Sequence, residues 1–160
     1  MTAITKASLH DELLGRLRDD LARLERAHEA ALEGATHAEA RPENAKDTRA
    51  LEQSYLARGQ SFRVEDLRRA VAEVATMTVA PFSEAQPIGV GALVTALEDE
   101  TERVFFIAPH GGGSTLARGT VQVVTPSSPL GRALVGRAEG DVCEIEAGGR
   151  SRELEIVTVR

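Results

Sequence analysis

The feature that most restricts the fold is a change of hydrophobic period near the middle of the 160-residue chain. Before about residue 78, apolar residues recur every three or four positions, which is the spacing of an amphipathic helix. After residue 88 they alternate with polar residues, which is the period of a strand. This order predicts an α+β fold in which helices come first and a small sheet domain follows.

The helical half, residues 8–77, predicts an antiparallel coiled-coil hairpin. Ser8 is a candidate N-cap. The first arm carries an a/d seam formed by Leu14, Leu17, Leu21, Leu24, His28 and Ala31. Helix-breaking residues between Gly34 and Asn44 predict the turn at the tip. Folding back through this turn is the simplest way for the two arms to bury their apolar faces.

The second arm shows two apolar patterns in succession. The first consists of Thr48, Leu51, Tyr55 and Phe62. The phase then shifts, and the pattern continues with Val64, Leu67, Val71, Val74 and Met77. Gly59 lies within this second arm, and its lack of a side chain would suit either a close approach or a bend.

A proline-containing segment at residues 78–87 is the expected linker, and residues 88–160 are the expected sheet domain. Gly148-Gly149 between two alternating runs predicts a tight hairpin. The strands are expected at Val90–Leu97, Val104–Ala108, Thr120–Val124, Asp141–Ala147 and Glu153–Val159.

A short helix is expected between the third and fourth of these strands. Ser128 is its candidate N-cap, Pro129 suits the first helical position, and Gly136 ends it. Leu130, Leu134 and Val135 then form one small apolar face that would cover the sheet.

Composition narrows the class of partner. The net charge is −6 and aromatic residues make up only 3% of the chain, so neither a basic face nor a base-stacking platform is expected. A protein partner is favoured. The single Cys143 excludes an intrachain disulfide, is expected to be a small buried residue, and fits a reducing cytoplasm. Neither a signal peptide nor a membrane span is expected, and the protein is expected to be a monomer.

Three stretches carry a resemblance to a known family. They are Thr125–Asp141, with its Ser-Pro-Leu-Gly run, Glu43-Asn44-Ala45, and Ile88-Gly89-Val90-Gly91. They resemble the C-terminal signature, the hairpin-tip tripeptide and the sheet-domain entry of the GreA/GreB bacterial transcription elongation factors. The resemblance implies that the second domain, after the hairpin, is a small FKBP-like antiparallel sheet domain with one short helix.

The resemblance also implies a function. Members of this family bind RNA polymerase, insert the hairpin into its secondary channel, and contact nascent RNA only inside that complex. Two acidic residues at the tip help to hold a Mg²⁺ ion of the polymerase active site, where the polymerase cleaves its own transcript. The chain would thus be an accessory factor rather than an enzyme, with no cofactor of its own. Ser128, Pro129, Leu130 and Gly131 are the expected polymerase-binding motif.

The expected tip departs from the family pattern, which reads roughly Gly-Asp-x-x-Glu-Asn-Ala. Glu43, Asn44 and Ala45 match, but Ala40 stands at the position of the aspartate and Glu39 precedes it. Two interpretations stay open. In one, Glu39 replaces the missing carboxylate. In the other, the protein occupies the channel without stimulating cleavage.

Two other functions compete with this interpretation. A prolyl isomerase or chaperone would need an aromatic-lined pocket, for which the sheet domain offers Phe82, Phe105 and Phe106. A generic coiled-coil interaction module would need no such pocket. The His110–Ser114 segment is expected to be a flexible turn rather than a phosphate cradle, because no lysine and no helix follow it.

Overall fold

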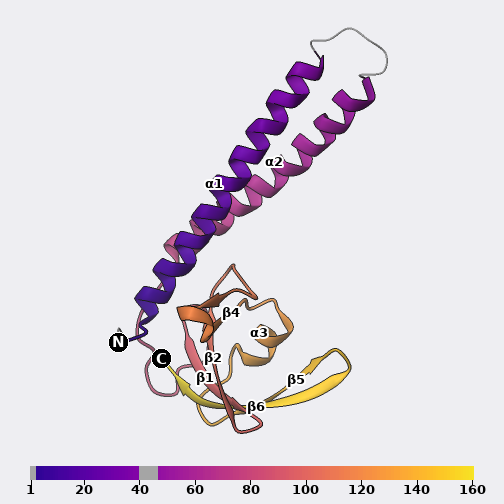
Figure 1. The fold of residues 1–160 in the computed structure, drawn as a ribbon. Coiled ribbons are helices and arrows are strands. Elements are labelled where there is room, and N and C mark those ends of the chain that lie inside the picture. Colours follow the sequence, from indigo (N-terminus) through magenta and orange to yellow (C-terminus); the bar gives the residue numbers. More distant parts are fainter. Residues whose placement is uncertain (1–2, 40–46) are drawn as a thin grey trace. The chain divides into compact units, whose positions relative to one another are not determined.

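The computed structural model describes residues 3–39 and 47–160. Two long helices, α1 (Lys6–Glu39) and α2 (Asp47–Thr76), come first, and a six-stranded sheet follows (Figure 1). The sheet and its short helix consist of β1 (Leu93–Glu98), β2 (Thr101–Ile107), β3 (Thr115–Leu116), β4 (Val121–Val124), α3 (Pro129–Leu134), β5 (Val142–Ala147) and β6 (Arg150–Val159). The predicted α+β class is confirmed.

The chain forms two compact units. Residues 15–72 form one, and residues 1–14 together with 73–160 form the other. The boundaries inferred from the sequence, at residues 8–77, 78–87 and 88–160, stay a prediction. None of the helices in the described residues combines the length and apolar character needed to cross a bilayer.

Both ends of α1 differ from expectation. The helix begins at Lys6, because Thr5 is its cap: the Ser8 amide donates to Thr5 Oγ1 and the Thr5 amide donates to Ser8 Oγ, each at 3.1 Å. The prediction of Ser8 as N-cap is wrong, since Ser8 is the reciprocal partner in a capping-box arrangement. The helix then continues through Gly34 to Glu39. A single helical glycine costs about 1 kcal/mol relative to alanine, which a long packed helix tolerates.

The strand order is β3-β4-β2-β1-β6-β5. The pair β2–β4 is parallel and the other four pairs are antiparallel, so the sheet is mixed rather than wholly antiparallel as expected. The reason is β3, a two-residue strand that the sequence did not reveal. It pairs antiparallel with β4 on the edge away from β2, so the chain reverses once more before β4, and β4 runs in the direction of β2. The Gly148-Gly149 hairpin is confirmed, because Ala147 pairs with Arg150 and both glycines have positive φ, as a type I′ turn requires.

The main core lies between one face of the sheet and α3. Phe105, Ile107, Leu134 and Ile156 belong to it and are at most 2% exposed, and Leu130 packs against it. Val135 is 38% exposed, so the apolar face expected of the short helix consists of Leu130 and Leu134 without Val135.

The first turns of α1 and the end of α2 are fastened to the sheet within one compact unit. Glu12 Oε2 accepts a hydrogen bond of 2.9 Å from the Ala117 amide, and His110 Nε2 lies 2.7 Å from Glu73 Oε2. Where a β-carbon added to Gly111 would lie, Leu13 Cδ1 is only 2.6 Å away. These contacts join both helices to loops of the sheet domain.

The two helices pair in antiparallel fashion within residues 15–72. Figure 1 shows α1 and α2 side by side. Arg68 Nη2 of α2 contacts Glu25 Oε1 of α1 at 2.9 Å, and Gly34 faces Gln53 further along. The predicted seam of α1 is confirmed as its inner face: Leu14 and Leu17 are buried, and Leu21, Leu24, His28 and Ala31 are half-buried.

The first of the two apolar patterns predicted for α2 does not form its inner face, so that prediction is wrong. Leu51, Tyr55 and Phe62 are 55%, 62% and 67% exposed, and Thr48 is exposed as well. The buried and half-buried residues described in α2 are instead Gln53, Ser54, Ala57, Gln60, Val64, Leu67, Ala70, Val71 and Val74. Because α2 is one unbroken helix, the face set by Val64 and Val74 continues towards its N-terminus in steps of three and four, and the predicted change of phase between Phe62 and Val64 does not occur. A β-carbon at Gly59 would meet nothing within 4 Å, so Gly59 serves no close approach.

The inner seam therefore becomes polar along the hairpin. Among the described residues, the side-chain atoms His28 Nδ1, Gln53 Oε1 and Gln60 Oε1 are buried without a hydrogen-bond partner. A buried polar atom in this state costs about 1–3 kcal/mol of stability. The two glutamines thus weaken the pairing of the arms in the part of the hairpin where they lie.

We expect Gln60→Leu to stabilise the protein, because leucine has a similar size and leaves no polar atom unsatisfied. The free energy of unfolding should rise by about 1–3 kcal/mol, measured by thermal or denaturant unfolding monitored at the helical circular dichroism signal. The matched control is Glu52→Leu at an exposed position of the same helix, with an expected change within about 0.5 kcal/mol. A lower unfolding midpoint for Gln60→Leu would contradict the burial of this side chain in the seam.

Candidate functional site

The run Ser128-Pro129-Leu130-Gly131 forms the beginning of α3. Ser128 has extended backbone angles (φ −68°, ψ 158°), and its Oγ accepts a hydrogen bond of 3.0 Å from the Gly131 amide. The same hydroxyl donates to the Thr125 carbonyl at 2.8 Å. Pro129 occupies the first turn, where its missing amide hydrogen has no partner to lose. The predicted cap is confirmed, and its hydroxyl has both a donor and an acceptor role in the backbone.

Gly131 is fixed by a backbone contact. A β-carbon at this position would lie 1.8 Å from the Thr125 carbonyl oxygen and 2.7 Å from its carbonyl carbon. Both atoms belong to the main chain, which cannot move aside as a flexible side chain can. Only glycine therefore allows the 125–128 turn and the helix start to pack at this distance.

The motif lines one side of an open groove of about 400 Å³. Pro129 and Leu130 contribute from α3, Thr125 from the end of β4, and Ile145 and Arg152 from the β5–β6 hairpin. Arg152 is the one charged side chain among the described residues that line the groove, and its Nη1 donates to Glu98 Oε1 at 3.0 Å. The groove is thus a mainly apolar surface with one cation at its border.

This groove has the chemistry of a binding surface. The Ser128 hydroxyl is engaged in the cap, and no histidine, cysteine or carboxylate is found among the described residues that line the groove. Within the described residues, no group of three metal-ligating side chains occurs anywhere. Cys143 is buried in the core, and this burial raises the pKa of its thiol, as expected for a structural residue rather than a nucleophile.

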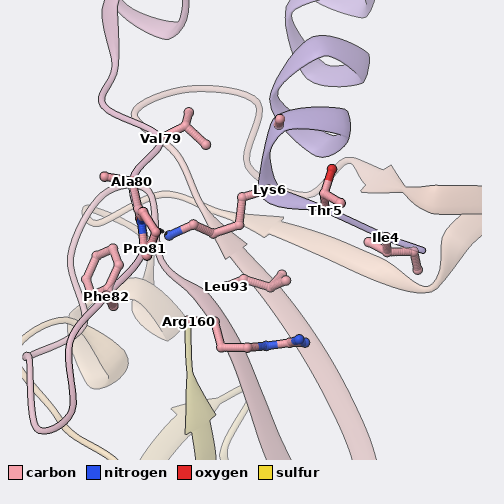
Figure 2. A pocket seen from close by; sticks show the side chains of 10 residues that line it. Ile4, Thr5, Lys6, Val79, Ala80, Pro81, Phe82, Leu93 and Arg160 are labelled. Carbon is pink, nitrogen blue, oxygen red and sulfur yellow. Dashed lines mark hydrogen bonds between the residues drawn. The ribbon is translucent and has the colours of Figure 1, made fainter. Parts of the chain in front are cut away.

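A second hollow, of about 490 Å³, lies between the start of α1 and residues 79–82 (Figure 2). Figure 2 shows Lys6 extending across it towards Ala80. The Lys6 ammonium donates to the Ala80 carbonyl and lies 4.5 Å from the centre of the Phe82 ring, and burial lowers its pKa. Of the two cations that line this hollow, Lys6 and Arg160, Lys6 is therefore already engaged in contacts with residues 80–82.

The aromatic residues do not form a ligand pocket. Phe105 and Phe106 are 2% and 0% exposed and belong to the interior of the sheet domain. Of the three candidates, only Phe82 lines a hollow, together with Lys6. Neither Phe105 nor Phe106 is among the described residues that line the two hollows.

The His110–Ser114 segment is a turn, as predicted, while its predicted flexibility stays a prediction. The Gly113 amide donates to the Val123 carbonyl at 3.0 Å, and the Ser114 amide donates to Gly111 at 3.1 Å. Together with the contact between His110 and Glu73, these bonds give the loop a structural role.

The structure describes only one of the expected tip residues. Glu39 is the last residue of α1, while Ala40, Glu43, Asn44 and Ala45 lie outside the described residues. Whether Glu39 and Glu43 come together stays a prediction.

Sequence reasoning missed Arg152 and the Thr125 carbonyl. Arg152 could have been found by counting from the Gly148-Gly149 turn, because that hairpin places it opposite Ile145. No sequence pattern marks the Thr125 carbonyl. It requires glycine at position 131 only because the two backbone segments approach each other closely in the folded chain.

Comparison with known proteins gives a consistent result. The family described as "Transcription elongation factor, GreA/GreB, C-term" matches residues 84–160. Proteins named transcription elongation factor GreA from Brucella canis and Brucella suis are 32% identical over 155 residues, covering 95% of this chain and 90% of each relative.

Solved structures were also compared. The GreA factor homolog 1 protein of Thermus thermophilus aligns with a TM-score of 0.40 at 16% identity, over 92% of this chain and 94% of that one. Its counterpart from Thermus aquaticus aligns with a TM-score of 0.41 at 20% identity, over 98% and 96%.

We expect Gly131→Ala to destabilise the sheet domain by several kcal/mol, because the new methyl group overlaps the Thr125 backbone and forces α3 away from the core. Unfolding by urea would measure the loss. Gly89→Ala is the matched control, since its β-carbon would meet nothing within 4 Å and its φ is not positive. Equal stability of the two variants would show that the turn at residues 125–128 yields without cost.

Proposed function

Because the chain belongs to the GreA/GreB family of transcription elongation factors, we propose that it binds bacterial RNA polymerase through the secondary channel. The sheet domain seats on the rim of the channel, and the helical hairpin enters it. The tip then reaches the polymerase active site, where it modulates backtracked complexes. The protein acts in the cytoplasm, where the polymerase is found.

The observation that carries this proposal is the groove beside Ser128-Pro129-Leu130-Gly131. It is apolar, is built on a helix start that the Gly131 contact holds in place, and has no catalytic group among its described lining residues. These properties suit a protein–protein contact. The 34-residue α1 supports the other part of the proposal, because a helix of that length spans roughly 50 Å and suits a deep channel.

For the chemistry at the tip, we propose a regulator that stimulates transcript cleavage weakly or not at all. Cleavage by two metal ions needs oxygen ligands for Mg²⁺, and the family supplies two carboxylates. Ala40 removes one of them, leaving Glu43 with Glu39 as the nearest substitute. The alternative, full cleavage stimulation through Glu39, requires that residue to take over the role of the missing aspartate.

Binding to the polymerase tests the first part of the proposal. The full-length protein should be retained by core RNA polymerase from its native host. Pro129→Asp should weaken binding about tenfold or more, because it places a charge on the apolar groove while an acidic residue remains compatible with a helix start. The matched control, Val157→Asp, adds the same charge at an exposed site on β6 and should bind as the wild type does. Failure of the wild type to bind would leave a coiled-coil module with another partner.

Cleavage of stalled transcripts tests the second part. We expect weak or no stimulation by the wild-type protein, and little change in Glu43→Ala, because a lone carboxylate contributes little to the shared metal site. The length of radiolabelled RNA in backtracked complexes is the readout. Brisk trimming by the wild type that Glu43→Ala abolishes would instead establish a cleavage factor despite Ala40.

The prolyl isomerase alternative loses support from the burial of Phe105 and Phe106. A proline-isomerisation assay with the full-length protein distinguishes it directly. Measurable catalysis would restore that alternative.

A further inference from the structure

Three exposed apolar residues of α2 form a second stripe, from which the exposed Leu56 is displaced by about 100° around the helix. Leu51, Tyr55 and Phe62 each precede an inner residue, Gln53, Ala57 and Val64 respectively, by two positions. Two residues correspond to about 200° of rotation in an α-helix, so the stripe lies on the side of α2 opposite the inner seam. It extends over about 16 Å at 1.5 Å per residue.

The stripe is unusual because the inner face of α2, on the opposite side of the same stretch of helix, is polar. Over residues 53–60 the seam contains two glutamines with unsatisfied buried oxygens. Along residues 51–62 the three apolar side chains of the stripe are 55–67% exposed, and Leu56, on a neighbouring side of the helix, is 56% exposed. Pairing of the two arms alone would favour the reverse arrangement, since burial of apolar surface drives it. The outward position of these residues therefore points to a contact outside the hairpin.

The area of the stripe bears on what that contact is. An aromatic side chain has about 150–250 Å² of surface that it can bury. At the exposed fractions of these residues, the three side chains together expose on the order of 300–400 Å². A stable dimer of two copies would need about 800 Å² on each partner. The stripe is thus too small to hold a second copy by itself, but it has the size of an apolar anchor inside a larger interface.

The charges of α2 argue against nucleic acid as the partner of this face. The helix carries five basic and five acidic side chains and so has no net charge. Binding to a phosphate backbone needs an excess of basic groups. An apolar protein surface is the better match.

We propose that Leu51, Tyr55 and Phe62 anchor the hairpin against an apolar protein surface of core RNA polymerase along the path by which it enters. This inference rests on the proposed function, which supplies a partner that encloses the hairpin and provides the rest of the interface. The stripe acts in binding and holds the hairpin in one rotational setting, separately from the acidic residues expected at the tip.

The test compares the affinity of purified full-length variants for core RNA polymerase. The triple variant Leu51→Gln, Tyr55→Gln and Phe62→Gln should bind about tenfold or more weakly. Its helical content and unfolding midpoint should match the wild type, because the positions are exposed and glutamine is a good helix former. The double variant Glu52→Gln and Arg63→Gln, at exposed positions on a different side of α2, leaves the net charge unchanged and should bind normally.

Each other outcome overturns the inference. If the triple variant binds core RNA polymerase as tightly as the wild type, the three residues are not an anchor, and the proposed function still stands. If the wild type does not bind core RNA polymerase, both the proposed function and the anchor are contradicted. A concentration-dependent dimer in sedimentation experiments that the triple variant abolishes assigns the stripe to self-association.

A photocrosslinking measurement keeps the proposal testable if the triple variant does not fold. With p-benzoylphenylalanine replacing Phe62, the crosslink should form to a polymerase subunit, and the same group replacing Arg63 should crosslink less. A crosslink mainly to RNA, or none in a complex that has formed, contradicts the protein contact.

Discussion

The continuity of α2 is the constraint on which the hairpin depends. An unbroken helix presents one face to one neighbour, and Val64 and Val74, at 3% and 0% exposure, decide which face that is. Once they are buried, the helical repeat brings Gln53, Ala57 and Gln60 inward and turns Leu51, Tyr55 and Phe62 outward. The polar seam and the apolar stripe are two results of the same geometry.

Much of the fold follows from local sequence signals. The change from a helical to an alternating pattern predicts the α+β class, and all five expected strands occur with modest shifts of their ends. The Gly148-Gly149 turn fixes the register of β5 and β6 because only one pairing suits a two-residue loop. The second arm was harder to predict, since its two apolar patterns satisfy helical spacing equally well. Only packing against a neighbour decides between them.

The candidate site likewise contains some features that local sequence predicts and others that it does not. The Ser128 cap and Pro129 are local features, and their roles in α3 could be predicted from four consecutive residues. The need for Gly131 could not, because it depends on how closely the Thr125 carbonyl approaches. Arg152 joins the groove through the pairing of β5 with β6, which the turn allows one to count but which no motif marks. The role proposed for Glu39 and Glu43 at the tip depends on the resemblance and on family membership, and not on a contact in the structure.

The change in composition along the inner seam also has a mechanical consequence. Leucine and valine side chains hold the arms together near the sheet domain, whereas glutamine, histidine and alanine do so further along. Local opening requires less free energy where fewer apolar contacts must be broken. The hairpin should therefore be graded in stiffness, firm at its attachment and compliant beyond it. Such a rod can adjust its outer half to a narrow passage while its anchored half keeps its shape.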